Sequence, residues 1–338
     1  VQDTNNIEEK LQIISKNFTK NLQFKFTINM RKIMRNAIVD IGSNTIRLIV
    51  FDVEENSRSF KKILNKKYTA GLITYVHDGE LSRKGIKKLI KTLSSIKNIV
   101  EELSVDSFTP FATASLRNLD NTEEVLEEVQ KSLGIKIDVL EQVEEAFLGN
   151  IGIRSEIDIK EGITIDIGGA STEIVYFEED GPSDFINLKT GSLLLFGENV
   201  STILPKKKEI RSIEKSIKRE IKSYSFSQKA DKLIGIGGTI RTTGKVIGDL
   251  WGEDEKNFTL DDVYKLLDLI KDRNTEAIRS IIRTNPARIH TIVPGIIILR
   301  TVMEKFGMYE IQVSSNGLRE GYLIYKVLDG NNEIIFSK

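Results

Sequence analysis

Several residue types are absent or scarce in this sequence of 338 residues. It contains no cysteine, which excludes disulfides, zinc–thiolate sites, iron–sulfur clusters and a cysteine nucleophile. Its two histidines, His77 and His290, are too few for a histidine-rich metal site, so any metal must be held by oxygen ligands. With 49 basic and 49 acidic residues the formal net charge is zero, which argues against a protein that coats DNA or RNA.

Long hydrophobic runs are missing as well. No apolar run approaches the roughly 18 residues of a membrane span, and residues 1–6 lack the basic start and apolar core of a signal peptide. With neither cysteine nor an export signal, we expect a cytoplasmic protein without a membrane partner. Residues 1–29 are polar and rich in Asn and Lys, and we expect an N-terminal extension that lies outside the fold.

Apolar residues make up 40% of the chain, which is typical of folded domains, and the length suggests two of them. Apolar runs predict strands at 37–39, 46–53, 60–68, 107–112, 135–140, 163–165, 173–177, 233–236 and 310–313. Spacings typical of one helix face predict helices at 86–103, 122–133 (with Thr122 as the N-cap), 141–154, 206–222 and 318–328. This alternation of strands and helices is typical of an α/β architecture.

The opening pattern of the chain occurs twice. A short apolar strand runs into Asp40-Ile41-Gly42 and a second strand follows, and the same order recurs around Asp166-Ile167-Gly168. This repeat predicts two related α/β domains that face each other, with a boundary near 150–160.

Three glycine-rich turns follow predicted strands, at 40–45, 166–172 and 235–239. Glycine lets main-chain N–H groups approach an anion closely, and a helix start behind such a turn adds partial positive charge. A single such turn is most often an ordinary tight turn, but three with hydroxyl side chains favour phosphate binding. A P-loop does not fit, because five residues separate Gly238 from Gly244 and the motif has four. A dinucleotide fingerprint does not fit either, because Ile240 stands in the place of its third glycine.

Some charged residues are candidates for chemistry, although each also has an ordinary structural interpretation. Asp40 and Asp166 end predicted strands and could hold Mg²⁺, but alone such a side chain more often caps its own turn. Arg117 follows a predicted strand and could bind phosphate or lie on the surface. Glu144 and Glu145 are adjacent on a predicted helix and point about 100° apart, so at most one of them faces a given site.

Taken in order, these motifs resemble those of the exopolyphosphatase / guanosine pentaphosphate phosphohydrolase (Ppx/GppA) family. The resemblance covers roughly residues 36–328 and rests on Asp40–Leu48, Ala112–Arg117, Glu144–Ala146, Asp166–Glu173, Gly235–Thr239, Val293–Gly295 and Gly317–Gly321. It implies an α/β, actin-like fold of the sugar kinase/Hsp70 superfamily, with duplicated ribonuclease H-like domains and an interdomain cleft. On this basis we expect domain I at 30–155 and domain II at 156–317, with the C-terminal helix 318–338 as a candidate to pack on domain I.

The resemblance also implies roles for individual residues. Glu145 corresponds to the glutamate that activates water, Arg117 to an arginine that stabilises developing charge, and Asp166 and Glu173 to carboxylates that hold Mg²⁺. The implied phosphate-binding residues are Gly42, Ser43, Asn44, Thr45, Gly168, Gly169, Ser171, Thr172, Gly237, Gly238, Thr239 and Arg288. Two departures from the family pattern are Ala170, where a third glycine is usual, and the pair Glu141-Gln142, where Ser-Gly is usual.

The implied reaction is the release of terminal phosphate from inorganic polyphosphate or pppGpp by water. Residues 206–232 carry ten Lys or Arg against four Asp or Glu; this is either a solvated face or a guide for a polyanion, and the second interpretation favours polyphosphate. A pppGpp-specific phosphohydrolase is the alternative, and an actin-fold small-molecule kinase and a non-catalytic sensor are weaker ones. The chain ends near residue 338, where longer members continue into an HD-type domain, so the resemblance is to the short form. Homodimers are common in the family, and we expect one here.

Overall fold

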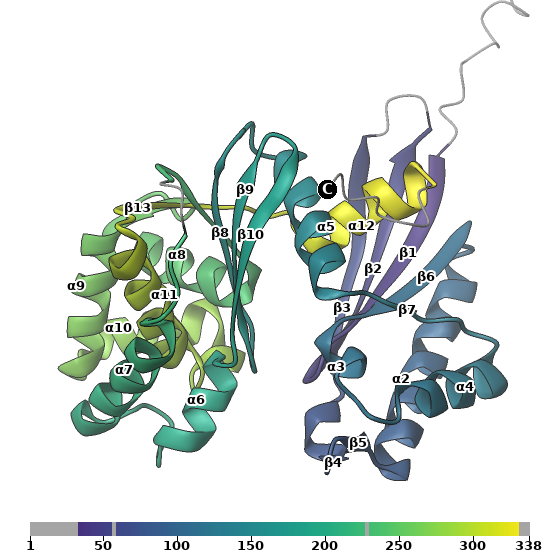
Figure 1. Cartoon of the computed structure of the whole chain (residues 1–338), viewed down its shortest axis with the longest axis horizontal. Helices are drawn as coiled ribbons and strands as arrows, with labels where there is room; N and C mark the ends of the chain where they lie inside the picture. The colour runs from purple at the N-terminus through teal and green to yellow at the C-terminus, as the bar shows by residue number, and fades with distance from the viewer. Residues whose placement is uncertain (1–32, 56–58, 227–229, 331–338) are drawn as a thin grey trace, which may run out of the picture.

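The structure is a computed structural model that describes residues 33–55, 59–226 and 230–330. The extension expected at 1–29 and the end of the C-terminal helix expected at 318–338 therefore lie outside the described residues. The described chain forms two mixed sheets that stand side by side, each with helices packed against it (Figure 1).

The first sheet has the strand order β3-β2-β1-β6-β7. Strands β1, β2 and β3 are consecutive antiparallel neighbours, whereas β6 and β7 run parallel to β1. The strands are β1 (Ile33–Ile41), β2 (Thr45–Glu54), β3 (Phe60–Thr69), β6 (Ser107–Ala112) and β7 (Asp138–Val139). The segments between and after them are η1 (Leu72–Tyr75), the small hairpin β4 (Val76–His77) and β5 (Glu80–Leu81), α2 (Arg83–Glu102), α3 (Ala114–Arg117), α4 (Thr122–Leu133) and α5 (Gln142–Arg154).

The second sheet repeats this order as β10-β9-β8-β11-β13, with β12 added at the edge. Its strands are β8 (Gly162–Ile167), β9 (Thr172–Glu178), β10 (Gly181–Leu188), β11 (Leu233–Ile236), β12 (Asn257–Thr259) and β13 (Glu310–Val313). Its helices are α6 (Ser192–Asn199), α7 (Lys207–Ile221), α8 (Gly237–Trp251), α9 (Leu260–Lys271), α10 (Thr275–Thr284), η2 (Pro286–Arg288) and α11 (Ile292–Phe306), and α12 (Leu318–Tyr322) follows β13. The same three antiparallel and two parallel strands thus occur twice, which confirms the expected duplicated, actin-like α/β fold.

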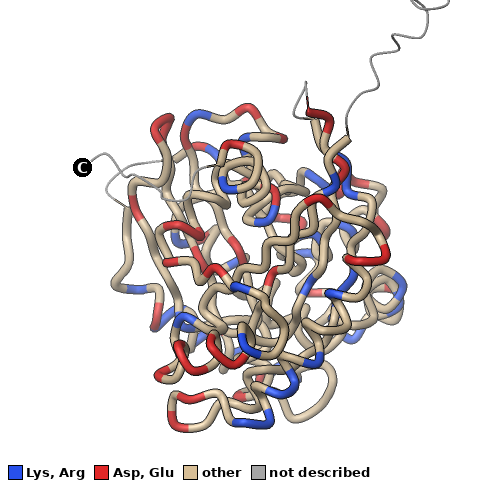
Figure 2. The backbone as a smooth tube through the Cα atoms, turned by 90° about the vertical axis from the view of Figure 1, so that its right-hand side faces the viewer, with Lys and Arg blue, Asp and Glu red and all other residues tan. Residues whose placement is uncertain are grey.

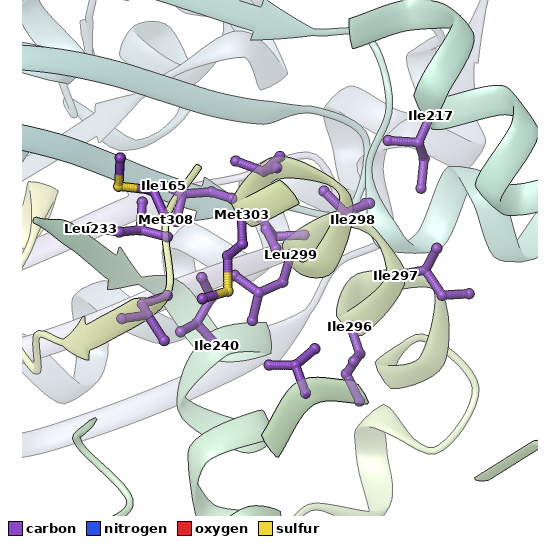
Figure 3. Close-up of a cluster of buried hydrophobic side chains, with 14 of the residues drawn as sticks. Ile165, Ile217, Leu233, Ile240, Ile296, Ile297, Ile298, Leu299, Met303 and Met308 are labelled. Atoms are coloured by element: carbon purple, nitrogen blue, oxygen red, sulfur yellow. The ribbon is translucent and has the colours of Figure 1, made fainter. Parts of the chain in front are cut away.

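The larger core lies between the second sheet and its helices. Ile165 of β8, Leu233 of β11 and Ile240 of α8 meet Met303 of α11, as Figure 3 shows. Residues Ile292–Met303 of α11 are all buried, so this largely apolar helix lies inside its domain. Burial of this size fixes the second sheet as a rigid support for the turns at its strand ends.

The structure differs from the sequence-based expectations at several element ends. Asn121 and not Thr122 is the N-cap of α4, and the Asn121 side chain bonds the main chain of Leu81. The strand expected at 135–140 is reduced to Asp138–Val139. The helix expected at 318–328 is an α-helix only to Tyr322 and continues as a π-helix over Leu323–Leu328. The sequence analysis did not predict β10 or β12.

Two segments connect the sheets: α5 leads into β8, and the chain returns from β13 through α12. These helices cross at glycines, because a Cβ on Gly152 would lie 2.0 Å from the carbonyl oxygen of Gly317. A Cβ on Gly321 would lie 1.7 Å from the carbonyl oxygen of Leu148. We propose that this crossing is the hinge between domain I and domain II, with α12 packing on domain I.

The crossing gives a first testable prediction. Gly152→Ala should lower the free energy of unfolding by about 1–3 kcal/mol, because the added methyl group cannot fit without separating the two helices. Gly149→Ala on the same helix is the matched control, since no atom lies within 4 Å of a Cβ built there, and alanine favours a helix over glycine. Urea denaturation of both variants checks this. Equal stability of the two would contradict the close crossing.

No helix in the described ranges is long and apolar enough to cross a membrane. Basic and acidic residues are interspersed along the backbone in the view of Figure 2. The basic helix α7 packs on α11 and α6, and Lys207 and Lys218 pair with Asp272 and Glu304.

Candidate active site

Each sheet carries the same tight turn between its first two strands. In the first, the N–H of Gly42 donates to the carbonyl of Thr45 at 3.0 Å; in the second, the N–H of Gly168 donates to the carbonyl of Ser171 at 3.0 Å. A Cβ on either glycine would lie 3.0 Å from the carbonyl oxygen that it faces, so both turns favour glycine for close packing. The two phosphate loops expected from the sequence are therefore built alike.

The carbonyl groups at these loop tips are used inside the protein. The Asn44 carbonyl accepts from the N–H groups of Ala70 and Gly71. The Gly169 carbonyl accepts from Leu193 and Leu194. Within the described part of the chain no acceptor is seen for the N–H groups of Ser43, Asn44, Gly169 and Ala170. Each loop thus presents donors and few acceptors, which is the polarity that an anion requires.

Ala170 does not disturb its loop. The residues other than glycine with positive φ in the described chain are Asp78, Ser104 and Arg273, so Ala170 needs no conformation reserved for glycine. The other departure from the family pattern, Glu141-Gln142, starts α5. The N–H of Glu141 donates to Glu144 Oε2 at 2.9 Å, which fixes the first turn of this helix.

The third glycine turn starts α8 and lies beside the second loop. Gly237 has φ +83°, and a Cβ there would lie 2.2 Å from Asp166 Oδ1. A Cβ on Gly238 would lie 2.1 Å from an Arg288 amino group. Glycine at both positions therefore lets a carboxylate and a guanidinium reach the positive end of α8.

The hydroxyl groups predicted to bind phosphate divide into two sets. Thr172 and Thr239 are buried, and their hydroxyls donate to the carbonyls of Thr190 and Ile167. Any phosphate contact there is left to the main chain. Ser171 Oγ donates to Glu173 Oε1 at 2.5 Å, while the side chains of Ser43 and Thr45 make no hydrogen bond with the described residues.

Glu145 and Arg117 come from different helices and form an ion pair. Glu145 lies in the first turn of α5, and Arg117 ends α3. Arg117 Nη1 lies 3.2 Å from Glu145 Oε2 and 2.7 Å from the carbonyl of Leu140. Burial raises the pKa of Glu145 to about 7, against the attraction of Arg117, and the charges of Asp40 and Asp166 act in the same direction as burial. Glu145 is thus poised to take a proton near neutral pH.

Asp166 and Glu173 are directly opposite each other on β8 and β9. Burial raises the pKa of both, and the charges of Asp166 and Glu145 add to raise that of Glu173 to about 8. Such shifts mark negative charge that is held out of water without an adequate counter-charge.

The donor set at these two carboxylates fits a hard divalent cation. Their oxygens are the ligands that Mg²⁺ prefers, and Mg²⁺ is commonly bound by one or two carboxylates together with substrate phosphates. No set of three or more His, Asp or Glu side chains arranged to hold a metal occurs in the described ranges. A cation here would therefore depend on phosphate oxygens and water for its other ligands.

The structure adds cations that the sequence analysis did not single out. Arg47 and Arg319 lie inside the quoted motifs, whereas Arg241 lies on α8 just after one of them and Lys67 lies on β3. Arg319 Nε donates to Asp40 Oδ2 at 2.7 Å, so Asp40 is paired with an arginine. Burial, and after it the charges of Arg319 and Arg241, lower the pKa of Arg47 to about 10. The quoted motifs contained two of these residues, but only the folded structure shows that all of them lie near one another.

A cavity of about 60 Å³ adjoins the carboxylates. Glu145, Asp166, Glu173 and Gln142 form its polar wall, and side chains such as Val175 and Leu318 form the apolar remainder. This is room for a few water molecules beside the proposed base. The residues expected from α5, β8 and β9 thus surround one space, while the basic residues of α7 are not among those that line it.

The model of the Ppx/GppA phosphatase family matches residues 49–329. Exopolyphosphatase 1 of Mycobacterium leprae is 22% identical over 87% of this chain and 90% of its own length. A guanosine-5'-triphosphate,3'-diphosphate pyrophosphatase of Aeromonas hydrophila is 26% identical over 88% of this chain and 60% of its own length. The crystal structure of the Aquifex aeolicus Ppx/GppA family member is 27% identical and superposes with a TM-score of 0.75, covering 89% of this chain and all of that one. The chain belongs to the Ppx/GppA phosphatase family.

Proposed function

We propose that this protein releases the terminal phosphate of inorganic polyphosphate by attack of water in the cleft between its two sheets. The proposal rests on the position of Glu145, which forms an ion pair with Arg117 and lines one cavity with Asp166 and Glu173. Two nearby loops present main-chain N–H donors. Phosphoryl transfer needs mainly positioning and electrostatic stabilisation, which suits a site without cysteine or histidine.

The residues act in distinct ways in the proposed reaction. The free N–H groups of the two loops hold the terminal phosphate from both sides. Glu145 accepts a proton from water in the adjoining space and orients that water for in-line attack. Arg117 keeps Glu145 in place and stabilises charge that develops on the phosphate oxygens. Asp166 and Glu173 would hold Mg²⁺, which supplies charge neutralisation when it is bound.

A pppGpp-specific phosphohydrolase is the second candidate function, because one relative is named for that class of substrate. The residues of α7 do not line the cavity beside the carboxylates, so the role of the basic stretch 206–232 as a guide for a polyanion stays a prediction. Support for polyphosphate comes instead from the cations around Arg47 and Arg288, which lie beside the carboxylates.

The substrate is tested by measuring kcat/KM for short polyphosphate, long polyphosphate and pppGpp side by side. We expect kcat/KM for both polyphosphates to exceed that for pppGpp by about tenfold or more. One additional charged contact contributes about 1.5–3 kcal/mol, which corresponds to a factor of this size. A sugar or carboxylic acid offered with ATP serves as the control for kinase activity. A preference for pppGpp would support the second candidate, and ATP-dependent transfer to an acceptor would contradict hydrolysis.

A further inference from the structure

Asn187 of β10 carries an acceptor that the fold does not use. Its side-chain oxygen Oδ1 is buried and accepts no hydrogen bond from any described residue. A buried acceptor without a donor costs folding free energy, and most buried polar atoms in proteins are paired. The missing donor is therefore to be sought in something that the protein binds.

Strand register places Asn187 beside the two carboxylates that could hold a cation. Asn187 of β10 is directly opposite Glu173 of β9, and Glu173 is directly opposite Asp166 of β8. Cross-strand partners share one face of a sheet, with Cβ atoms about 4.5–5.5 Å apart, so the three side chains form one row. Phe185, two residues before Asn187 and on the same face, lines the cavity of about 60 Å³ together with Asp166 and Glu173.

The order of this row decides how Asn187 can serve a cation. Glu173 stands in the middle, and since neighbouring strands lie about 4.8 Å apart, the main chains of Asp166 and Asn187 are about 10 Å from each other. Mg²⁺ binds oxygen at about 2.0–2.1 Å and keeps several waters, so a cation held by the two carboxylates is within reach of Asn187 through one water. Such a water turns its hydrogens away from the cation and needs an acceptor, which Asn187 Oδ1 is.

We propose that Asn187 is a positioning residue of the cation site, whose Oδ1 accepts a hydrogen bond from a water molecule on the cation held by Asp166 and Glu173. The inference rests on the proposed function and deepens it by adding a neutral oxygen to the two carboxylates. A neutral acceptor suits this place, because burial and the charges of Asp166 and Glu145 already raise the pKa of Glu173 to about 8. A third carboxylate would add to this repulsion whenever the cation is absent.

The role of Asn187 is tested by cation binding, which is independent of turnover. Mn²⁺ is the probe, because it prefers the same oxygen ligands as Mg²⁺ and because the electron paramagnetic resonance signal of the free ion is lost on binding. Asn187→Leu should weaken Mn²⁺ binding about 10- to 100-fold, the usual effect of removing a group that orients the ligands of a metal. Asn187→Asp keeps an acceptor and adds a negative charge, so it should bind Mn²⁺ at least as tightly as the wild type.

The stability of the metal-free protein separates this role from an ordinary structural one. Asn187→Leu should have the same thermal midpoint Tm as the wild type or a higher one, since it removes an acceptor that has no donor. Asn187→Asp should have a lower Tm at pH 8, since it adds a carboxylate beside Glu173. In turnover, the Mg²⁺ concentration that gives half the maximal rate should rise in Asn187→Leu by the same factor as the loss of Mn²⁺ affinity.

Asp184→Asn is the matched control on the same strand. Asp184 lies three residues before Asn187, so it points to the opposite face of the sheet. Its carboxylate accepts from the N–H of Phe185 at 2.8 Å, which asparagine also does. This variant loses a full negative charge but should keep the Mn²⁺ affinity within twofold of wild type.

Two results would overturn the proposed role. Wild-type Mn²⁺ affinity in Asn187→Leu would remove Asn187 from the cation site. Equal weakening of Mn²⁺ binding by Asn187→Leu and Asn187→Asp would mean that the site depends on the shape of asparagine and not on an acceptor. A wild type whose Mn²⁺ binding depends on Asn187 but that releases no phosphate would contradict the proposed function and leave the role of Asn187 standing.

Discussion

Replacing Glu145 by glutamine is expected to lower kcat for phosphate release by about 10²- to 10⁴-fold, the usual contribution of a positioned general base. Glutamine has the same shape and can still bond Arg117, but it cannot accept a proton from water. Steady-state phosphate release from polyphosphate measures the effect. KM should change little, because the loops that hold the terminal phosphate are untouched.

Glu144→Gln is the control for this substitution. Glu144 precedes Glu145 on α5 and accepts a hydrogen bond from the N–H of Glu141, which glutamine also does. This variant should keep near wild-type activity. For the wild type, kcat/KM should rise with pH through about 7, because the carboxylate form of Glu145 is the active base and its pKa is raised to about 7 by burial. Equal activity of Glu145→Gln and wild type would remove Glu145 from the reaction.

Replacing Glu173 by glutamine should stabilise the metal-free protein at pH 8 while it nearly abolishes activity. Burial and neighbouring carboxylates raise the pKa of Glu173 to about 8 from its ordinary value of 4.5. The folded protein therefore keeps a proton that the unfolded chain releases above pH 4.5, and stability falls as the pH rises from about 4.5 to about 8. Glutamine removes this loss and can still accept the bond from Ser171.

The measurement is the thermal midpoint Tm of both proteins with and without Mg²⁺. Each kcal/mol gained corresponds to about 2–4 °C for a domain of this size, so the metal-free variant should melt several degrees higher than wild type at pH 8, with little difference at pH 4. Added Mg²⁺ should raise the Tm of wild type and not that of Glu173→Gln, because a bound ligand stabilises the folded state. The same Mg²⁺ response in both proteins would exclude Glu173 as a cation ligand.

The repeated hairpins were the most predictable part of the fold. Apolar strands that end in Asp-Ile-Gly predicted two related α/β domains. In the structure, β1 and β8 are the central strands of equivalent sheets. Short and irregular elements were less predictable. The strand β10 contains Asp184 and Asn187 between its apolar residues and has a register shift near Pro182, so the sequence lacks the regular alternation of a strand.

The candidate site was predictable where side chains lie within a motif and unpredictable where they converge through strand pairing. The turn motifs and Glu145 followed from the family resemblance. Arg47 and Lys67 did not stand out, because their shared place beside Asp40 depends on the register of three strands. The basic charge of α7 was visible in the sequence, but its position on α11 depends on tertiary packing, and part of it is taken up by ion pairs with Asp272 and Glu304.

The most direct test of hydrolysis at this site is phosphate release from tripolyphosphate in water enriched in heavy oxygen. If Glu145 activates water for attack on the terminal phosphorus, wild-type protein should release orthophosphate that carries one solvent oxygen, and Glu145→Gln should release almost none in the same time. Orthophosphate without solvent oxygen, or labelled orthophosphate formed equally fast by Glu145→Gln, would contradict water attack driven by Glu145.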